Sequence, residues 1–198
     1  GIKKQLFFWA LKLGQRFDLD NDLGWWYNTQ MKLAGKLIFS KWREALGGNV
    51  EFVVSGGAAL QPRLATIFWA AGIRILEAYG LTETSPGVTF SRDDKIKIGT
   101  VGPTLDRVQV KIAEDGEVLV KGPNVMMGYY KNPDATKQVL TEDGWFHTGD
   151  IGEMVDNTFL KITDRKKEMF KTSGGKYIAP QLLENSLKES MLLEKVMV

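Results

Sequence analysis

The chain has 198 residues, of which 43% are apolar and 25% charged, with a formal net charge of +2. This composition is typical of a globular protein with a buried core, and so small a net charge does not indicate nucleic acid as a partner. The absence of cysteine excludes disulfides and thiolate chemistry, and a single histidine, His147, excludes a site built from several histidines.

The first fifty residues are predicted to be helical. Residues 2–17, 25–39 and 41–46 carry apolar side chains at helical spacing, and Gly47 follows the last of these segments as a typical helix end. The first helix is apolar around much of its circumference, which favours packing against another part of the protein over a position on a membrane surface. No apolar run reaches the about 18 residues of a membrane span. The absence of cysteine fits a reducing compartment, and we expect a cytoplasmic protein, with peripheral membrane association as the alternative.

A strand, a helix and a second strand follow in residues 50–55, 62–71 and 73–78. A β-α-β unit makes its two strands parallel, so the loops after them lie at the same edge of the sheet. These loops are residues 56–59, which contain two glycines, and residues 79–84. The carboxyl edge of such a sheet is where ligands bind, and we therefore expect the two loops to flank one site.

The loop that begins at Tyr79 combines several groups that suit a nucleotide. Tyr79 offers an aromatic face to a base, and Gly80 ends the strand. Thr82 can donate a hydrogen bond to a phosphoryl oxygen, while Glu83 offers the hard oxygen ligands that Mg²⁺ prefers. The alternative is an ordinary turn beside a tyrosine of the core.

The pattern changes after about Ser85 to that of an antiparallel β-subdomain. Asn132 is expected to cap a short helix that ends near Leu140. The strands are expected at residues 108–112, 117–120, 145–155 and 159–162, joined in pairs by the turns Asp115-Gly116 and Asp156-Asn157.

The last part of the chain is expected to begin a small domain. The charged residues 164–168 are interpreted as a solvated linker, and residues 172–176 as a turn. Pro180 then starts a helix, and residues 194–198 indicate the beginning of a strand. Both ends of the sequence suggest a piece of a longer protein.

Four motifs are together more informative than any of them alone: Ser55-Gly56-Gly57-Ala58, residues 79–84, residues 143–150 and residues 164–167. In this order and at these separations they resemble the adenylate-forming superfamily of acyl-CoA synthetases, luciferases and adenylation domains. The forms YGLTETSP, DGWFHTGD and DRKKEMFKTSGGKYIAP are most similar to the long-chain fatty acid–CoA ligases. The resemblance covers roughly residues 51–198.

The resemblance implies an α/β fold with a parallel βαβ portion, an antiparallel β-subdomain and the start of a small α+β domain. Residues 1–87 would be the helical and βαβ part of the large AMP-binding domain, and residues 88–166 its β-subdomain. Residues 167–198 would begin the C-terminal domain. The family's upstream phosphate loop and its downstream catalytic lysine have no counterpart in this sequence, so we expect this chain alone to be inactive.

In such enzymes a carboxylate attacks the α-phosphorus of ATP, and the thiol of coenzyme A then displaces AMP from the acyl-adenylate. The resemblance implies that Tyr79 stacks on the adenine and that Gly80 beside it belongs to the cofactor-binding site. Gly57 and Ala58 would line the edge of the adenine and the region of the acyl carbonyl. The resemblance further implies that Thr82 binds the α-phosphate. Glu83 would bind Mg²⁺.

The resemblance assigns the remaining roles to the second half of the chain. Asp150 would accept the two ribose hydroxyls, and Arg165 would donate to the ribose or phosphate oxygens. Lys167 would be the hinge of the small domain, and Gly174 would leave room for the pantetheine arm of coenzyme A. The alternatives are a turn role for Asp150, a solvated charge at Lys167 and a plain turn at Gly174; His147 is interpreted as structural.

We therefore predict an ATP-dependent ligase that joins a fatty acid to coenzyme A. Two alternatives stay open: another adenylate-forming enzyme, such as an acyl-AMP ligase or an aryl-CoA ligase, and a noncatalytic nucleotide-binding module. An upstream phosphate loop and a downstream Gly-Lys motif in the full-length protein would favour the enzymes.

Overall fold

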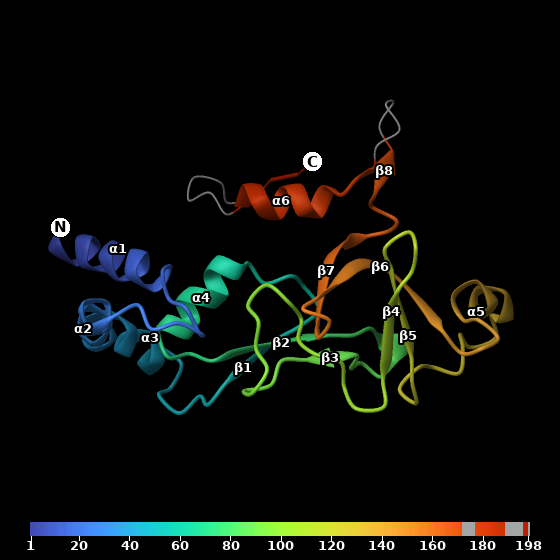
Figure 1. Ribbon diagram of the computed structural model, residues 1–198, viewed down its shortest axis with the longest axis horizontal. Helices are drawn as coiled ribbons and strands as arrows, with labels where there is room; N and C mark the ends of the chain where they lie inside the picture. The colour runs from blue at the N-terminus through green and yellow to red at the C-terminus, as the bar shows by residue number, and fades with distance from the viewer. Residues whose placement is uncertain (172–176, 189–195, 198) are drawn as a thin grey trace. The chain divides into compact units, whose positions relative to one another are not determined.

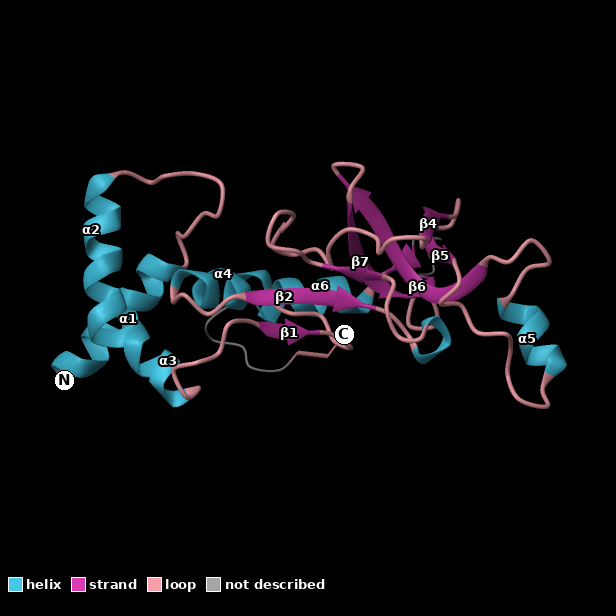
Figure 2. Ribbon diagram, turned by 90° about the horizontal axis from the view of Figure 1, so that it is seen from below, coloured by secondary structure: helices cyan, strands magenta, loops and turns pink. Residues whose placement is uncertain are grey.

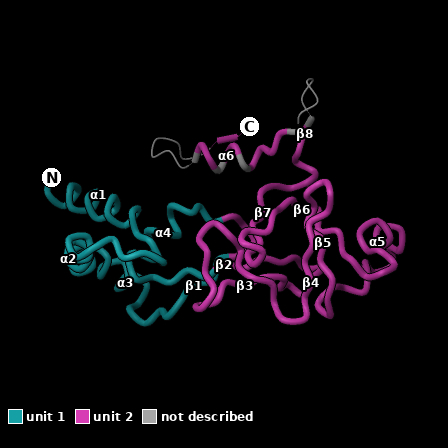
Figure 3. The backbone as a smooth tube through the Cα atoms, in the orientation of Figure 1, with its two compact units in different colours: residues 1–55, 60–76 teal, residues 56–59, 77–198 magenta. Residues whose placement is uncertain are grey.

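The computed structural model describes residues 1–171, 177–188 and 196–197, and Figure 1 shows the order of their helices and strands. The chain forms two compact units, coloured separately in Figure 3. One contains residues 1–55 and 60–76, and the other contains residues 56–59 and 77–198. The mixed α/β class predicted from the sequence is confirmed. The domain boundaries at residues 87 and 166 are not tested by this division and remain predictions.

Helices make up most of the first unit, as the spacing of apolar residues predicts. The segments expected at residues 25–39 and 41–46 form one continuous helical stretch, because a π-helical turn joins the two α-helices. Among the described residues, no helix has both the length and the apolar content to cross a membrane. The helices are α1 (Ile2–Gly14), α2 (Trp25–Ala34), the π-helical turn η1 (Gly35–Phe39), α3 (Ser40–Ala45) and α4 (Pro62–Ala70).

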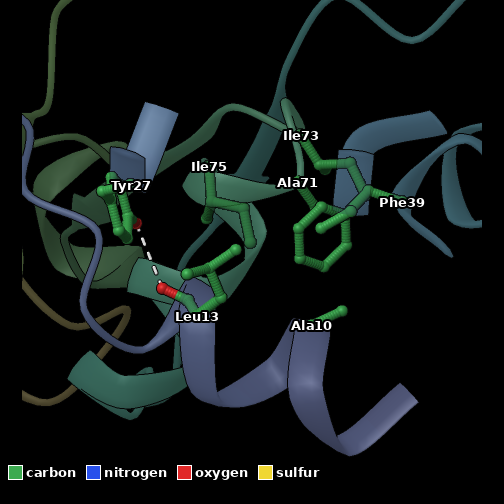
Figure 4. Packing of buried hydrophobic residues seen from close by; sticks show 8 residues of the cluster. Ala10, Leu13, Tyr27, Phe39, Ala71, Ile73 and Ile75 are labelled. Carbon is green, nitrogen blue, oxygen red and sulfur yellow. Dashed lines mark hydrogen bonds between the residues drawn. The ribbon is translucent and has the colours of Figure 1, made fainter. Parts of the chain in front are cut away.

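The core of the first unit lies where these helices meet the start of the second strand. Leu13 of α1, Phe39 at the end of the π-helical turn, and Ile75 belong to one buried cluster, part of which is drawn in Figure 4. Tyr27 joins this cluster with its ring and donates its hydroxyl to the Leu13 carbonyl oxygen at 3.1 Å, so the only polar atom of its side chain is satisfied.

A three-stranded sheet has the order β1–β2–β3, with β1 at Val53–Ser55, β2 at Ile75–Tyr79 and β3 at Thr89–Phe90. The arrows of β1 and β2 point the same way in Figure 2, as expected for a β-α-β unit. Strand β3 pairs with β2 in the antiparallel direction. The strand predicted at residues 50–55 is too long, because β1 begins only at Val53. Tyr79 is the last residue of β2, where a loop position was expected.

The second unit is built on a four-stranded antiparallel sheet of order β4–β5–β6–β7. Both predicted hairpins are confirmed, since β4 pairs with β5 and β6 pairs with β7 in the antiparallel direction. Helix α5 (Pro133–Val139) begins as predicted, with the Asn132 side chain accepting from the Ala135 backbone N–H at 3.1 Å. The strands are β4 (Gln109–Ile112), β5 (Glu117–Lys121), β6 (Phe146–Val155) and β7 (Phe159–Arg165).

The interpretation of residues 164–168 as a solvated linker is wrong for its first two residues. Strand β7 continues to Arg165, and Asp164 is fully buried within it. A short hairpin of β8 (Phe170–Lys171) and β9 (Tyr177–Ile178) precedes helix α6 (Pro180–Lys188). The turn predicted at residues 172–176 lies outside the described residues, as do residues 194, 195 and 198 of the predicted terminal strand.

Candidate active site

Three of the predicted site residues meet at one carboxylate. The Tyr79 hydroxyl at the end of β2 donates to Asp150 Oδ2 at 2.6 Å, and Arg165 Nε lies 3.1 Å from Asp150 Oδ1. Asp150 and Arg165 face each other in the β6–β7 pairing, which fixes the position of their backbones. The structure therefore brings together residues from three separate motifs.

Burial gives this cluster its electrostatic character. The Asp150 side chain exposes only 6% of its surface, whereas that of Arg165 exposes 59%. Burial raises the pKa of Tyr79 well above its usual range, and the hydrogen bond to Asp150 raises it further. The tyrosine therefore stays protonated and remains a donor. Because each carboxylate oxygen carries two lone pairs, both Asp150 oxygens can accept a further hydrogen bond once Arg165 turns away.

The loop of residues 56–59 lies against the end of β2. A Cβ added at Gly56 would lie 3.3 Å from the Ala78 carbonyl oxygen, which is tighter than most real contacts. Gly57 has a φ of +78° and faces open space, since a Cβ there would meet no atom within 4 Å. Ala58 is exposed. This loop is therefore held close to the strand at one glycine and open at the next.

The loop after Tyr79 folds back tightly on itself. A Cβ at Gly80 would lie 1.4 Å from the Pro86 carbonyl oxygen, so any larger residue must displace the backbone. The Thr84 side chain is fully buried, and its Oγ1 accepts from the Leu81 backbone N–H at 2.9 Å. The side-chain amide of Asn124 donates to the Gly87 carbonyl oxygen at 2.6 Å. These contacts make the loop a fixed platform.

Two residues of the platform present polar side chains. Thr82 is exposed, and Glu83 is half-buried in the short 3₁₀ turn η2 (Thr82–Thr84). The Tyr129 hydroxyl donates to Glu83 Oε1 at 2.9 Å, and the Met126 backbone N–H donates to the Glu83 carbonyl oxygen at 2.8 Å. Both contacts orient Glu83, and no residue in the described part of the chain is hydrogen-bonded to its Oε2.

Two further predicted positions lie apart from this cluster or outside the structure. Lys167 is exposed in the turn after β7. Gly174 lies outside the described residues, so its predicted role at the pantetheine arm is not addressed.

The sequence interpretation missed Tyr129, Asn124 and Glu117, all of which contact the predicted motifs. Glu117 accepts a hydrogen bond from the Gly149 backbone N–H at 3.0 Å, directly before Asp150. Because Glu117 directly follows the Asp115-Gly116 turn, the local sequence does not predict that its side chain is buried. Tyr129 lies 46 residues from its partner Glu83, and no local pattern connects such a pair.

Comparison with known families identifies the class of protein that this arrangement defines. The family of AMP-binding enzymes matches residues 23–130, more than half of the chain. The chain therefore belongs to the AMP-binding enzyme family.

Similar proteins within this family are ligases that act on fatty acids. The chain is 47% identical over 163 residues to long-chain-fatty-acid–CoA ligase FadD15 of Mycobacterium bovis, which covers 82% of this chain and 27% of that protein. It is 38% identical over 213 residues to fatty acyl-CoA synthetase A of Dictyostelium discoideum, covering 100% of this chain and 31% of that protein. It is 40% identical to long-chain-fatty-acid–CoA ligase 5 of Rattus norvegicus, covering 82% of this chain and 26% of that protein. The chain thus spans about a quarter to a third of the length of these relatives.

Solved structures agree with the predicted fold of adenylate-forming enzymes. The o-succinylbenzoate CoA synthetase MenE of Bacillus subtilis, in complex with its acyl-adenylate intermediate, is 25% identical with a TM-score of 0.67, covering 80% of this chain and 36% of that one. The same enzyme in complex with ATP and a magnesium ion is 26% identical with a TM-score of 0.63, covering 74% and 34%.

Proposed function

We propose that the full-length protein is an ATP-dependent ligase that joins a long-chain fatty acid to coenzyme A, with AMP and pyrophosphate as the other products. The observation that carries the proposal is the contact of Tyr79 and Arg165 with the buried carboxylate of Asp150. The Asp150 carboxylate lies in the same compact unit as the platform that presents Thr82 and Glu83. The named relatives support a fatty acid as the substrate.

The adenosine half of ATP is assigned to the glycine loop and Tyr79. Gly57 is open enough for a flat base to approach its backbone, with Ala58 exposed beside it. The Tyr79 ring would stack on the adenine next to Gly80, held in place by its hydroxyl on Asp150.

The ribose and the phosphates are assigned to the charged groups. Asp150 would accept from both ribose hydroxyls through its free lone pairs. This requires Arg165 to turn aside, which its exposed side chain allows, and its guanidinium would then donate to the ribose or to a phosphate oxygen. Thr82 would donate its hydroxyl to the α-phosphate.

A magnesium ion fits Glu83. In the described part of the chain, no group of three or more acidic or histidine side chains could hold a metal by itself. Mg²⁺ bound with a nucleotide takes only one or two carboxylates, and the phosphates and water supply its other ligands. One oriented carboxylate with a free oxygen meets this need. When bound, the ion would neutralise phosphate charge as pyrophosphate leaves.

The reaction then has two balanced steps. A carboxylate oxygen of the fatty acid attacks the α-phosphorus, the bond to the β-phosphate bridging oxygen breaks, and pyrophosphate leaves with that oxygen. The sulfur of coenzyme A, after losing its proton, attacks the acyl carbon, and AMP leaves with the oxygen that came from the fatty acid. The fatty acid is already ionised at neutral pH, so the first step needs no general base.

The two steps require different surroundings at the same acyl-phosphate bond. The exposed Lys167, in a turn between β7 and β8, is assigned as the hinge at which the small domain changes position. Gly174 would admit the pantetheine arm in the second step.

The test is a product assay on the purified full-length protein with ATP, Mg²⁺, coenzyme A and carboxylic acids of increasing chain length. We expect AMP and acyl-CoA in equal amounts, with the highest kcat/KM for long chains. An aromatic acid as the preferred substrate would support an aryl-CoA ligase instead. Adenylate without thioester would support an acyl-AMP ligase. ATP binding with no pyrophosphate release from any acid would support a noncatalytic module.

A further inference from the structure

Glu117, at the start of β5, is a buried carboxylate that the reaction does not use. Only 4% of the residue is exposed. Its Oε1 accepts from the Gly149 backbone N–H at 3.0 Å. Its Oε2 accepts from Lys166 Nζ at 2.8 Å and lies 3.0 Å from His147 Nδ1. One carboxylate thus holds three partners from two segments of the chain.

The partners of Glu117 directly precede two residues that the proposed function needs. Gly149 is followed by Asp150, the ribose ligand, and Lys166 is followed by Lys167, the hinge. The two segments are also joined directly, because the Lys166 backbone N–H donates to the Gly149 carbonyl oxygen at 2.8 Å. Gly149 is therefore held at its backbone N–H by the Glu117 side chain and at its carbonyl oxygen by the Lys166 backbone N–H.

We propose that Glu117 is a positioning residue that holds the Asp150 backbone for ribose binding and anchors the fixed side of the hinge through Lys166. The inference rests on the proposed function and adds a residue to it. Lys166 is then tied to the antiparallel sheet by its charged pairs with Glu117 and Asp115, and the movement of the small domain is assigned to begin at the next residue, Lys167.

The charges around Glu117 support a single, ordered arrangement. The groups that face it are Lys166, His147 and, through Lys166, Asp115, whose Oδ2 lies 2.7 Å from Lys166 Nζ. Burial by itself would raise the pKa of Glu117, but the hydrogen bonds from His147, Lys166 and Gly149 outweigh it and lower that pKa. The hydrogen bonds to Asp115 and then Glu117 raise the pKa of Lys166. The pair therefore stays charged.

Two substitutions of Glu117 separate its two contacts in the full-length protein. Glu117→Ala removes the acceptor for Gly149 and the partner of Lys166 together. Glu117→Gln keeps a carbonyl oxygen that can accept from the Gly149 N–H, but it loses the negative charge that pairs with Lys166. Lys166→Met removes the same charged pair from the other side, together with the contact of Lys166 with Asp115. Glu114→Gln is the matched control, because Glu114 is an exposed carboxylate on the same hairpin.

We expect Glu117→Ala to raise the KM for ATP in adenylation about tenfold, the usual effect of losing one hydrogen bond to a charged group. The KM for the fatty acid should stay unchanged, and Glu117→Gln should raise the ATP value much less. In single turnovers from preformed acyl-adenylate, Glu117→Gln and Lys166→Met should each slow thioester formation several-fold. The double variant should be no slower than Lys166→Met alone, since both substitutions remove the Glu117–Lys166 pair and Lys166→Met also removes the contact with Asp115. Glu114→Gln should match the wild type in both assays.

Thermal unfolding of each variant measures how much of it is folded. If the KM values of folded Glu117→Ala equal those of the wild type, or if Glu117→Gln and Lys166→Met slow the thioester step additively, the inference is wrong. It is also wrong if Glu117→Ala lowers kcat alone, because loss of folded enzyme would explain that result. A wild-type protein that releases no pyrophosphate with any acid would instead refute the proposed function.

Discussion

The Tyr79 hydroxyl donates to Asp150 Oδ2 at 2.6 Å, and 71 residues of sequence separate the two. This hydrogen bond joins the end of β2 in the three-stranded sheet to β6 of the antiparallel sheet. It has a charged acceptor and is partly buried, which makes it one of the stronger contacts of its kind. Through it, the predicted adenine and ribose contacts form one cluster within a single compact unit.

Replacing Asp150 by Ala in the full-length protein should reduce the use of ATP far more than the use of fatty acid. Two hydrogen bonds to a charged group contribute about 1.5–3 kcal/mol each. Their loss should lower kcat/KM for ATP at least ~10²-fold, because about 1.4 kcal/mol corresponds to a factor of ten. Asp134→Ala, at an exposed position of α5, is the control. Unchanged ATP kinetics in a folded Asp150→Ala protein would exclude the ribose role.

Replacing Tyr129 by Phe should lower the affinity of the enzyme for Mg²⁺. The Tyr129 hydroxyl orients Glu83, and loss of such a partner of a metal ligand typically costs about tenfold in metal affinity. The Mg²⁺ concentration for half-maximal adenylation should rise by that order. Tyr130→Phe is the matched control, because the neighbouring Tyr130 is 87% exposed. Equal Mg²⁺ curves for the two variants would show that Tyr129 does not act on the metal ligand.

Glu77 should make the protein less stable as the pH rises. Burial raises its pKa from 4.5 to about 7, while the Gly99 backbone N–H opposes the shift. Because the folded state binds the proton more tightly, this stabilisation is fully present below pH 4.5 and is lost as the pH rises through about 7. The loss amounts to about 3 kcal/mol, since one pKa unit corresponds to about 1.4 kcal/mol.

The Glu77 prediction is measured by thermal unfolding of the wild type and Glu77→Gln at pH 5 and pH 8. Glutamine resembles the protonated acid, so the two proteins should be similar at pH 5, and the variant should have the higher Tm at pH 8. Glu114→Gln should show no such difference. A Tm gap between wild type and Glu77→Gln that stays constant over this range would contradict the raised pKa.

Replacing Lys167 by Pro should separate the two half-reactions. Proline fixes φ near −65° and also restricts Lys166 before it, so rotation at the hinge would be hindered. We expect pyrophosphate release in a single turnover to remain close to normal and thioester formation to be suppressed. A parallel fall of both steps would mean a structural role for Lys167, and no change in either would place the hinge elsewhere.

Local chemistry explains why much of the fold could be predicted from the sequence. The turns at Asp115-Gly116 and Asp156-Asn157 adopt positive φ at Gly116, Asp156 and Asn157, the conformation for which these residue types are suited. The cap at Asn132 likewise depends on a residue three positions away. In each case the interaction is short-range, so the residue type is sufficient evidence.

Contacts between distant segments account for what could not be predicted. Charge alone suggested that Asp164 and Arg165 belonged to a solvated linker, but pairing with β6 extends β7 through both and buries Asp164, while Arg165 stays exposed. The burial of Glu117 depends on partners 32 and 49 residues away. No pattern within β5 carries that information.

Isotope transfer from the fatty acid to AMP tests the central claim most directly. The full-length protein is given a fatty acid with ¹⁸O in both carboxylate oxygens, together with ATP, Mg²⁺ and coenzyme A, and the AMP is examined by mass spectrometry. If the carboxylate attacks the α-phosphorus and the thiol then displaces AMP, each AMP carries one ¹⁸O and the pyrophosphate carries none. Label in pyrophosphate or phosphate, or thioester formed with unlabelled AMP, would contradict the acyl-adenylate chemistry assigned to this site.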